Sequence, residues 1–279
     1  MKKTAALTMV RSDDGFLRKW VEYYSAAFGP ENLYVWFDGF DQVVPDFCSE
    51  VHTGHIEHVK ADVHAGDRRR IDYLSSRAAE LFSQGYELVV GTDVDEFLVV
   101  DPALGVSLPE YLSSVRTSLP SISGLGIDVG QKLSEEGTVD WSRPFLSQRR
   151  YAKLSTRYSK ASVLCRPVEW GSGFHRTRKG NFHIVKDLYL FHFGCVDLDR
   201  IKSKMDDAGL TDEGWSRHLS KRAGTIRLVS TARARDWDSA VKKARFLQNA
   251  FRPPYAWNKP AMFEARIVVL IPERFRGVV

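Results

Sequence analysis

Short apolar runs alternate with amphipathic segments along the first hundred residues, and this alternation restricts the fold more than any other feature of the chain. The runs predict strands at residues 4–10, 32–38, 54–61 and 86–93. Apolar residues that recur at helical spacing predict helices at residues 13–29 and 66–85. Strands that alternate with helices favour an α/β fold whose central sheet is mainly parallel.

The pattern loosens after Asp101. Further strands are expected at residues 121–130, 160–167 and 187–194, and a last short element at 265–275. Helices are expected at residues 107–119, 197–208, 212–223 and 236–251. We therefore expect a single domain with a helical C-terminal appendage. The domain covers residues 1–209, in two halves of 1–101 and 102–209, and the appendage covers residues 210–279.

The chain is mildly basic, with a formal net charge of +5 and an isoelectric point near 9.0. Such a charge suits a phosphorylated small molecule, an anionic membrane surface or nucleic acid. No aromatic-interleaved basic motif or zinc-finger spacing is present, which argues against nucleic acid. Three cysteines without paired spacing suit a reducing cytosol. No apolar run approaches the roughly 20 residues of a membrane span. We expect a cytoplasmic protein, with peripheral association at the inner face of the membrane as an open alternative.

Four carboxylates stand in and just beyond a segment that otherwise looks like a buried strand, ELVVGTDVDEFLVVD, at Asp93, Asp95, Glu96 and Asp101. Isolated carboxylates there would be costly to desolvate, so they need a partner or a cation. Carboxylate oxygens suit magnesium or manganese, and magnesium fills its other positions with water and substrate phosphates. A strand end capped by acidic turn residues is the simpler alternative. Glu96 and Asp101 are expected only to support the strand end.

Other strand ends also carry polar residues. Ligands of open α/β sheets bind beyond the carboxyl ends of the strands, and Arg11 follows the first predicted strand while Asp38 ends the second. Both are candidates to bond to a nucleobase or ribose. Arg70 belongs to the sequence DRRR at the start of a predicted helix, where backbone amides and arginines together favour an anion such as a diphosphate. A solvated basic first turn is the alternative.

The opening segment TMVRSDDGFLRKWVEYYSAAFGPENLYVWFDGFDQ resembles that of family 2-like glycosyltransferases of the GT-A fold, including the family 92 (domain of unknown function 23) branch. VVGTDVDEFLVV is similar to that group's Asp-x-Asp-Glu-Phe segment, and KASVLCRP, GFHR and LFHFGCVDLDRIKSKMDDAG are similar to its later stretches. The resemblance runs in order from about residue 4 to residue 209. The chain departs from it at Ser12–Asp13, where the family has Asn-Glu, and after Asp38, where Gly39 and Phe40 interrupt its Asp-Asn-x-Ser pattern.

This resemblance implies a GT-A-type, Rossmann-like fold and a glycosyltransferase. The donor would be a nucleoside-diphosphate sugar, the cofactor Mn²⁺ or Mg²⁺, and the acceptor a glycan or lipid-linked glycan, in bacterial surface polysaccharide synthesis. Asp38 would contact the base or ribose, and Asp93 the ribose or donor sugar. Asp95 and His192 would ligate the metal, together with Asp93. On this basis Asp95→Ala is expected to abolish transfer and leave the fold intact.

Candidates for the catalytic base remain open. An inverting transfer needs a carboxylate to deprotonate the acceptor hydroxyl. Asp128 in GIDVGQ and Glu169 in PVEWGSG both follow strand-like segments. His175 lies in the glycine-flanked loop GSGFHR, which could approach a ligand, although lone loop histidines are usually just exposed.

Two other functions fit parts of the same sequence. In a haloacid-dehalogenase-like phosphohydrolase Asp93 would be the nucleophile beside magnesium. Against this, the strand before Asp93 is the fourth, not near the N-terminus, and Glu96 replaces the usual Thr or Val. A non-catalytic module that docks an acidic partner is the third alternative. The ordered carboxylates at the strand ends argue against it.

Overall fold

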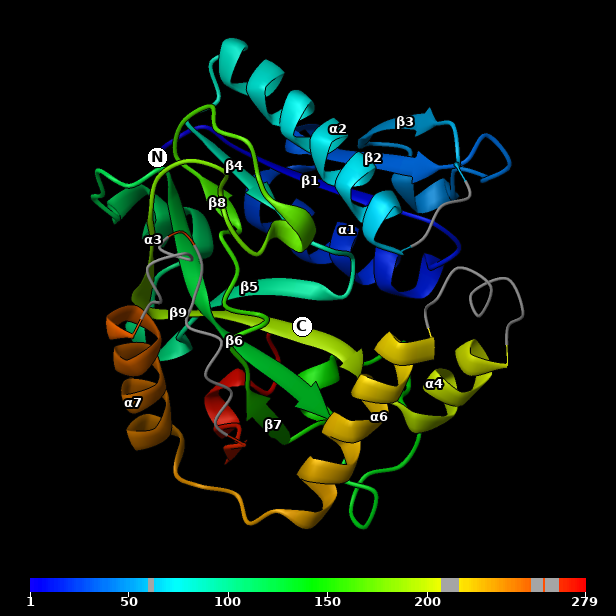
Figure 1. Ribbon diagram of the computed structural model, residues 1–279, viewed down its shortest axis with the longest axis vertical. Helices are drawn as coiled ribbons and strands as arrows, with labels where there is room; N and C mark the ends of the chain where they lie inside the picture. Colours follow the sequence, from blue (N-terminus) through cyan, green and yellow to red (C-terminus); the bar gives the residue numbers. More distant parts are fainter. Residues whose placement is uncertain (60–62, 207–215, 252–257, 259–265) are drawn as a thin grey trace.

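The computed structural model describes residues 1–59, 63–206, 216–251, 258 and 266–279 (Figure 1). Within them one ten-stranded sheet runs through the centre of the molecule. Its strands are β1 (Thr4–Val10), β2 (Leu33–Asp38), β3 (His52–Ile56), β4 (Leu88–Gly91), β5 (Glu96–Val100), β6 (Ser121–Gly130), β7 (Tyr151–Leu154), β8 (Val163–Leu164), β9 (Phe182–Cys195) and β10 (Val268–Leu270). The helices are α1 (Asp14–Phe28), α2 (Val63–Ser83), α3 (Leu108–Ser114), α4 (Leu198–Met205), α6 (Ser216–Thr231) and α7 (Trp237–Ala250).

The sheet is mixed, and most of its strands run in one direction. Its main path is β10-β7-β6-β8-β4-β1-β2-β3, and β9 pairs with both β5 and β6. The pairs β1–β2, β1–β4, β2–β3 and β6–β9 are parallel. The remaining pairs are antiparallel. They show that β5, β7 and β8 run in the opposite direction to the other seven strands of the sheet. The predicted α/β class with a mainly parallel sheet is confirmed, and the three strands that run against the others all come after β4 in the chain.

Helices α1 and α2 cover opposite faces of the parallel strands because side chains alternate along β1. Ala6 and Val10 belong to the cluster that holds the buried face of α1, which is formed by Phe16, Leu17, Trp20, Val21 and Tyr24. Ala5, Leu7 and Met9 pack on the other face, against Ile71, Leu74, Ala78 and Leu81 of α2. β1 is buried along its whole length, as expected for an apolar run without polar alternation.

The carboxylate-rich segment forms two strands with a turn between them. β4 ends at Gly91, and β5 starts at Glu96 and pairs with β9 instead of continuing along β4. Thr92 fixes the start of the turn: its hydroxyl accepts from Trp20 Nε1 at 2.8 Å and its carbonyl accepts from Thr8 Oγ1 at 2.8 Å. Asp93 and Asp95 therefore lie in a turn beyond the carboxyl end of β4.

The C-terminal segments pack on the second half of the sheet. α6 contacts β6, β7 and β9, α7 contacts β9, and β10 extends the sheet beside β7. The strand predicted at 160–167 is reduced to the two residues of β8. Parts of the strand predicted at 54–61 and of the helices predicted at 197–208 and 212–223 lie outside the described residues. None of the helices in the described part of the chain combines the length and apolar character needed to cross a bilayer.

Candidate functional site

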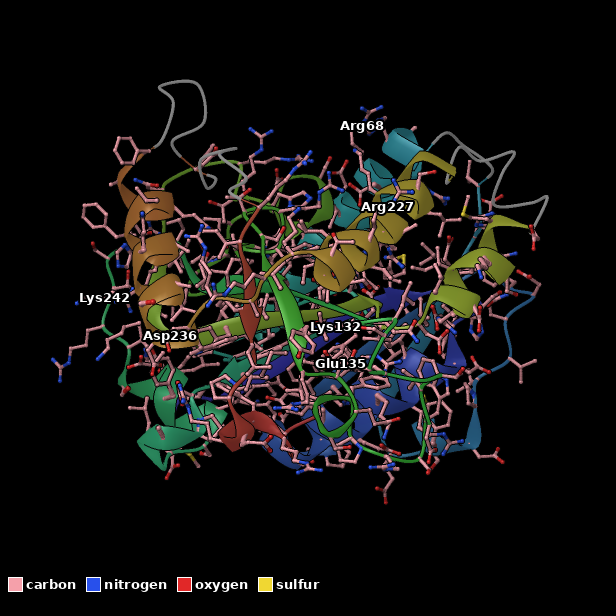
Figure 2. All side chains as sticks on the ribbon, turned by 90° about the horizontal axis from the view of Figure 1, so that it is seen from below. Arg68, Lys132, Glu135, Arg227, Asp236 and Lys242 are labelled. Atoms are coloured by element: carbon pink, nitrogen blue, oxygen red, sulfur yellow. The ribbon has the colours of Figure 1, made fainter. Side chains whose placement is uncertain are left out.

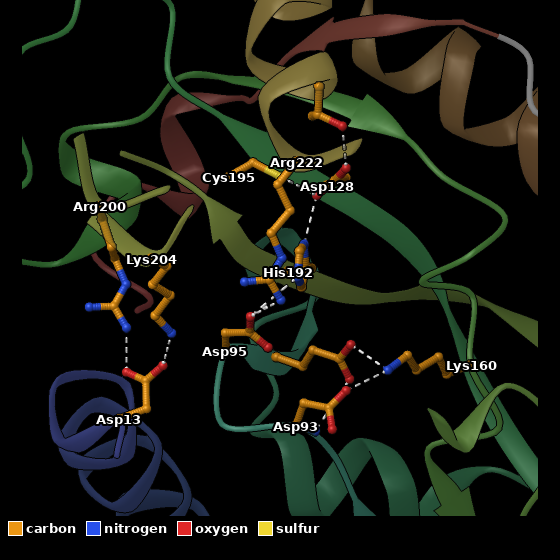
Figure 3. Close-up of polar contacts among 12 residues, drawn as sticks. Asp13, Asp93, Asp95, Asp128, Lys160, His192, Cys195, Arg200, Lys204 and Arg222 are labelled. Carbon is orange, nitrogen blue, oxygen red and sulfur yellow. Dashed lines mark hydrogen bonds and ion pairs between the residues drawn. The ribbon is translucent and has the colours of Figure 1, made fainter. Parts of the chain in front are cut away.

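The strand register places His192 of β9 between two carboxylates from neighbouring strands (Figure 3). It lies opposite Glu96 on β5 and beside Asp128 on β6. Asp95 completes the group, and its backbone carbonyl accepts from Phe193 N at 2.8 Å. The side chains of His192 and its three acidic neighbours are all buried. Side chains from three strands and one turn thus meet in one cluster.

Asp128 orients the imidazole of His192. Its Oδ1 lies 2.7 Å from Nδ1 of His192, and its Oδ2 accepts from the hydroxyl of Thr225 at 2.9 Å. Tyr158 stacks on the imidazole with the ring centroids 3.7 Å apart. The other ring nitrogen, Nε2, lies 3.3 Å from Oδ2 of Asp95. A carboxylate that holds one nitrogen of a histidine, while the other nitrogen faces a site, is typical of metal-ligating histidines.

The cluster fits a divalent cation by donor type and by spacing. Asp93, Asp95 and Glu96 offer carboxylate oxygens within 4.8 Å of one another, and oxygen ligands suit Mg²⁺ or Mn²⁺. Adjacent ligand atoms of an octahedral ion with bonds of about 2.1 Å lie about 3.0 Å apart. The 3.3 Å between His192 Nε2 and Asp95 Oδ2 is close to that value. Burial lowers the pKa of His192, but Asp95 and Asp128 raise it well above its usual range, so a cation would replace a proton on this imidazole.

Arg222 of α6 forms an ion pair with Asp95. Its Nη2 lies 3.0 Å from Oδ2 of Asp95, the same oxygen that faces His192 (Figure 3). Burial raises the pKa of Asp95, but the charges of His192 and Arg222 outweigh burial and hold the pKa well below its usual range. The carboxylate is therefore ionised under all ordinary conditions.

Asp93 is held by two further cations. Its Oδ1 lies 2.6 Å from Nη1 of Arg70, and its Oδ2 lies 2.8 Å from Nζ of Lys160. Lys160 Nζ also lies 2.6 Å from Oε1 of Glu96, and both of these side chains are almost fully buried. Burial raises the pKa of Glu96 to about 7, although the charge of Lys160 acts against this rise. Glu96 therefore belongs to the charged cluster, whereas the sequence suggested only a role in supporting the strand end.

A second group of polar residues lies where β1 and β2 end. Arg11 donates from Nη1 to the backbone carbonyl of Asp38 at 2.6 Å and pairs with Asp41 at 3.0 Å. The carboxylate of Asp38 lies 2.9 Å from Nδ1 of His58, so the structure joins the two predicted residues Arg11 and Asp38 and adds a histidine. A hollow of about 410 Å³ opens beside them and is lined by Ser12, Asp14, Asp41, Gln42 and Val43.

The three predicted candidates for the catalytic base differ in burial and in their contacts. Asp128 is buried and bonded through both oxygens, so its role as an acceptor base stays a prediction that these contacts do not favour. Glu169 is exposed and pairs with Arg178 at 2.7 Å, away from the Asp93–Asp95 turn in its described contacts. His175 lies near enough to Asp93 for the two charges to act on each other. Sequence patterns gave no sign of Lys160, Thr225 or Arg222.

His175 should make the protein less stable in mild acid. Burial and the positive charge of Lys160 lower the pKa of His175 to about 3. In the unfolded chain the same imidazole takes up a proton near pH 6.5. The folded protein stays neutral at this residue, so stability is lost as the pH falls below 6.5. We expect His175 to lower the free energy of unfolding by about 2 kcal/mol between pH 7 and pH 5.

Denaturant unfolding of the wild type and of His175→Gln at several pH values measures this effect. The raised pKa of Glu96 gives an opposite slope in the same range, because a protonated Glu96 favours the folded state at lower pH. The difference between the two proteins, rather than the wild-type slope, therefore isolates His175. A difference that stays constant from pH 7 to pH 5 would contradict the neutral state of this half-buried imidazole.

No protein-family model and no curated protein matches the chain. Among solved structures, the chain is similar to one from Desulfovibrio desulfuricans described as a nucleotide-diphospho-sugar transferase, with 11% identity and a TM-score of 0.28 over 45% of this chain and 59% of that one. This match spans less than two thirds of that protein. The chain is also similar to the mannose-1-phosphate geranyltransferase from Thermus thermophilus, with 12% identity and a TM-score of 0.29 over 96% of this chain and 74% of that one. Similarity at this level carries no argument about function, which rests on the residues of the site.

Proposed function

We propose that the protein is a metal-assisted glycosyltransferase that moves a sugar from a nucleoside-diphosphate sugar to a glycan or lipid-linked glycan. One observation carries this proposal: Asp95 and His192 face each other across 3.3 Å beyond the carboxyl end of β4, and Asp128 holds the imidazole in place. The resemblance of the sequence to GT-A transferases assigns the metal to the same two residues. The proposal thus has support from both geometry and sequence.

The residues of the cluster divide into ligands and supporting groups. Asp95 and His192, together with Asp93, would hold Mn²⁺ or Mg²⁺, which when bound neutralises the charge on the departing diphosphate. Asp128 positions His192 through its Oδ1. Arg70 and Lys160 lie beside Asp93, where their charges favour phosphate oxygens.

The nucleoside would lie at the ends of β1 and β2. Arg11 and Asp38 meet there beside the hollow of about 410 Å³, a volume within the usual range for small-molecule sites. The hollow lies at the carboxyl ends of adjacent parallel strands, which is where ligands usually bind in open α/β sheets. We assign the donor nucleotide to the half formed by residues 1–101.

The acceptor side is assigned to residues 102–209 and, through Arg222 and Thr225, to the C-terminal extension 210–279. Of the predicted bases, His175 is placed closer to the cluster, because its charge and that of Asp93 act on each other, whereas Glu169 is exposed and paired with Arg178. A pKa of about 3 nevertheless makes the imidazole of His175 a weak proton acceptor. A lipid-linked acceptor would place the protein at the inner face of the membrane, in surface polysaccharide synthesis.

Thermal unfolding with a panel of nucleoside diphosphates and diphosphate sugars, with and without Mn²⁺, tests the proposed function. We expect one nucleotide to raise the midpoint by about 5–10 °C at a hundredfold excess over its dissociation constant, and only when Mn²⁺ is present. The shift arises because the ligand binds only the folded state, and the nucleotide that gives it names the donor base.

Thermal unfolding together with a phosphate-ester hydrolysis assay separates the transferase from the phosphohydrolase. Lys160 beside Asp93 would also suit a phosphorylated aspartate. The absence of a shift with every nucleotide, together with hydrolysis of a generic phosphate ester that is lost in Asp93→Asn, would replace the transferase by the phosphohydrolase.

A further inference from the structure

Arg222 contacts one of the two atoms that face each other in the proposed metal site and lies beside the other. Its guanidinium contacts Oδ2 of Asp95 at 3.0 Å. Oδ2 is also the oxygen 3.3 Å from Nε2 of His192. A divalent ion bound by Oδ2 and Nε2 would therefore lie next to the guanidinium, and two cations in a buried site repel each other strongly.

Gly194 shows how closely Arg222 and His192 approach. A Cβ atom at this position would lie 2.6 Å from Nε2 of His192 and 2.7 Å from Cζ of Arg222. Only a residue without a side chain leaves room for both groups there. The guanidinium of Arg222 thus lies beside the ligand nitrogen of His192 as well as the ligand oxygen of Asp95.

We infer that Arg222 is a displaceable internal cation of the metal site. It neutralises Asp95 while no divalent ion is bound, and it moves to the diphosphate of the donor when metal and nucleotide bind. This inference rests on the proposed function. The planar guanidinium is well suited to the second role because it binds phosphate oxygens in a bidentate manner.

The exchange couples the metal to the nucleotide. Metal alone must displace Arg222 from Asp95, so it binds weakly. The nucleotide offers Arg222 a new anionic partner and thereby makes the metal bind more tightly. By linkage, the metal strengthens nucleotide binding by the same factor. α6 carries Arg222 and also bonds to Asp128 through Thr225, so this helix contacts both the ligand carboxylate and the residue that positions His192.

Arg222→Gln tests the exchange, with Arg227→Gln as its matched control. Arg227 belongs to the same helix and is exposed (Figure 2), so its replacement removes an equal charge from α6 outside the cluster. Mn²⁺ binding is measured by electron paramagnetic resonance of the free ion, first with Mn²⁺ alone and then with uridine diphosphate and guanosine diphosphate in turn. Circular dichroism and thermal unfolding report whether each variant folds.

Arg222→Gln should bind Mn²⁺ alone about tenfold more tightly than the wild type does. The factor by which a nucleotide raises the Mn²⁺ affinity should be at least about fivefold smaller in Arg222→Gln than in the wild type. Arg227→Gln should match the wild type in both measurements. Arg222→Lys, which keeps the charge, should show the same changes at smaller size and decides the test if Arg222→Gln does not fold.

Two negative outcomes are distinguishable. If the wild type binds Mn²⁺ with a nucleotide but the Arg222 variants have the same affinities and coupling as Arg227→Gln, the exchange is wrong and the proposed function stands. If neither the wild type nor any of these variants binds Mn²⁺ with these two nucleotides or with any other nucleoside diphosphate of the thermal unfolding panel, the proposed function fails and the exchange fails with it.

Discussion

Asp95→Asn is expected to lower the rate of sugar transfer at least about a thousandfold while the protein stays folded. The substitution removes the negative charge that, with His192, faces the proposed cation, and stabilisation of charge by a bound metal contributes several kcal/mol to such reactions. The asparagine keeps a carbonyl oxygen that can still accept from Arg222. Initial rates with the donor identified by thermal unfolding, together with Mn²⁺ affinity, measure the effect.

Asn is a better replacement than Ala at this position. The sequence alone suggested that Asp95→Ala would leave the fold intact, but Asp95 is buried and paired with Arg222 and His192. Alanine would leave the half-buried Arg222 without its carboxylate and would remove one of the two carboxylates that face the buried His192. Removing one partner of such a pair typically costs about 3–5 kcal/mol of stability. Loss of activity in Asp95→Ala would therefore mix a structural effect with a catalytic one.

Asp101→Asn is the matched control. Asp101 comes from the same acidic segment, is as deeply buried as Asp95 (6% exposed against 7%), and also pairs with an arginine, Arg274, at 2.6 Å. Its replacement should disturb stability to a similar extent and leave transfer almost unchanged. If Asp95→Asn retained more than about a tenth of the wild-type rate, the metal role of Asp95 would be wrong.

The parallel half of the sheet and its strand ends were predictable from the sequence because they depend on local patterns. The apolar runs at residues 4–10 and 32–38 have no polar alternation, so they predict strands covered on both faces. The rule that ligands bind beyond the carboxyl ends of such strands then selects Asp38 and the turn with Asp93 and Asp95. His192 was predicted as a metal ligand only because the segment with LFHF resembles a stretch of GT-A glycosyltransferases.

The partners of these residues were not predictable because they depend on tertiary contacts. Lys160 is the first residue of the strand predicted at 160–167, and nothing in that pattern pairs it with Asp93 or Glu96. Arg222 lies in a predicted helix that resembles nothing known. Asp128 illustrates the limit: its position after a strand-like run suggested a base, but only the register of β6 against β9 shows that it holds His192. A sequence pattern places a residue on an element, whereas the role depends on what the neighbouring strand presents.

At about pH 9–10, where Glu96 is ionised in the wild type, Lys160→Met should destabilise the protein by about 3–5 kcal/mol and lower its midpoint of thermal unfolding by about 10 °C. Lys160 is 3% exposed and lies between Asp93 and the fully buried Glu96. Methionine fills a similar volume but leaves the Glu96 carboxylate without a cation. Arg70 still compensates Asp93, so Glu96 carries most of the cost. Denaturant and thermal unfolding measure the loss.

The pH dependence of this loss identifies Glu96 as its source. In the wild type the pKa of Glu96 is about 7. Above that pH Glu96 is ionised in both the folded and the unfolded state, so its contribution to the free energy of unfolding no longer depends on pH. Without Lys160 the pKa rises further, and a raised acid pKa lowers stability as the pH increases. The deficit of Lys160→Met should therefore grow by about 1.4 kcal/mol per unit above pH 7.

Glu96→Gln in the Lys160→Met background should remove that growth, because an amide has no charge to leave unpaired. Lys202→Met is the exposed counterpart: Lys202 pairs with Asp199 at 3.3 Å on the surface of α4, and exposed pairs contribute about 0.2–1 kcal/mol. If the deficit of Lys160→Met were as small as that of Lys202→Met, or constant above pH 7, the buried carboxylate would not depend on Lys160. The charged cluster would then be stabilised chiefly by the arginines, and Lys160 would be free to act on the donor phosphates alone.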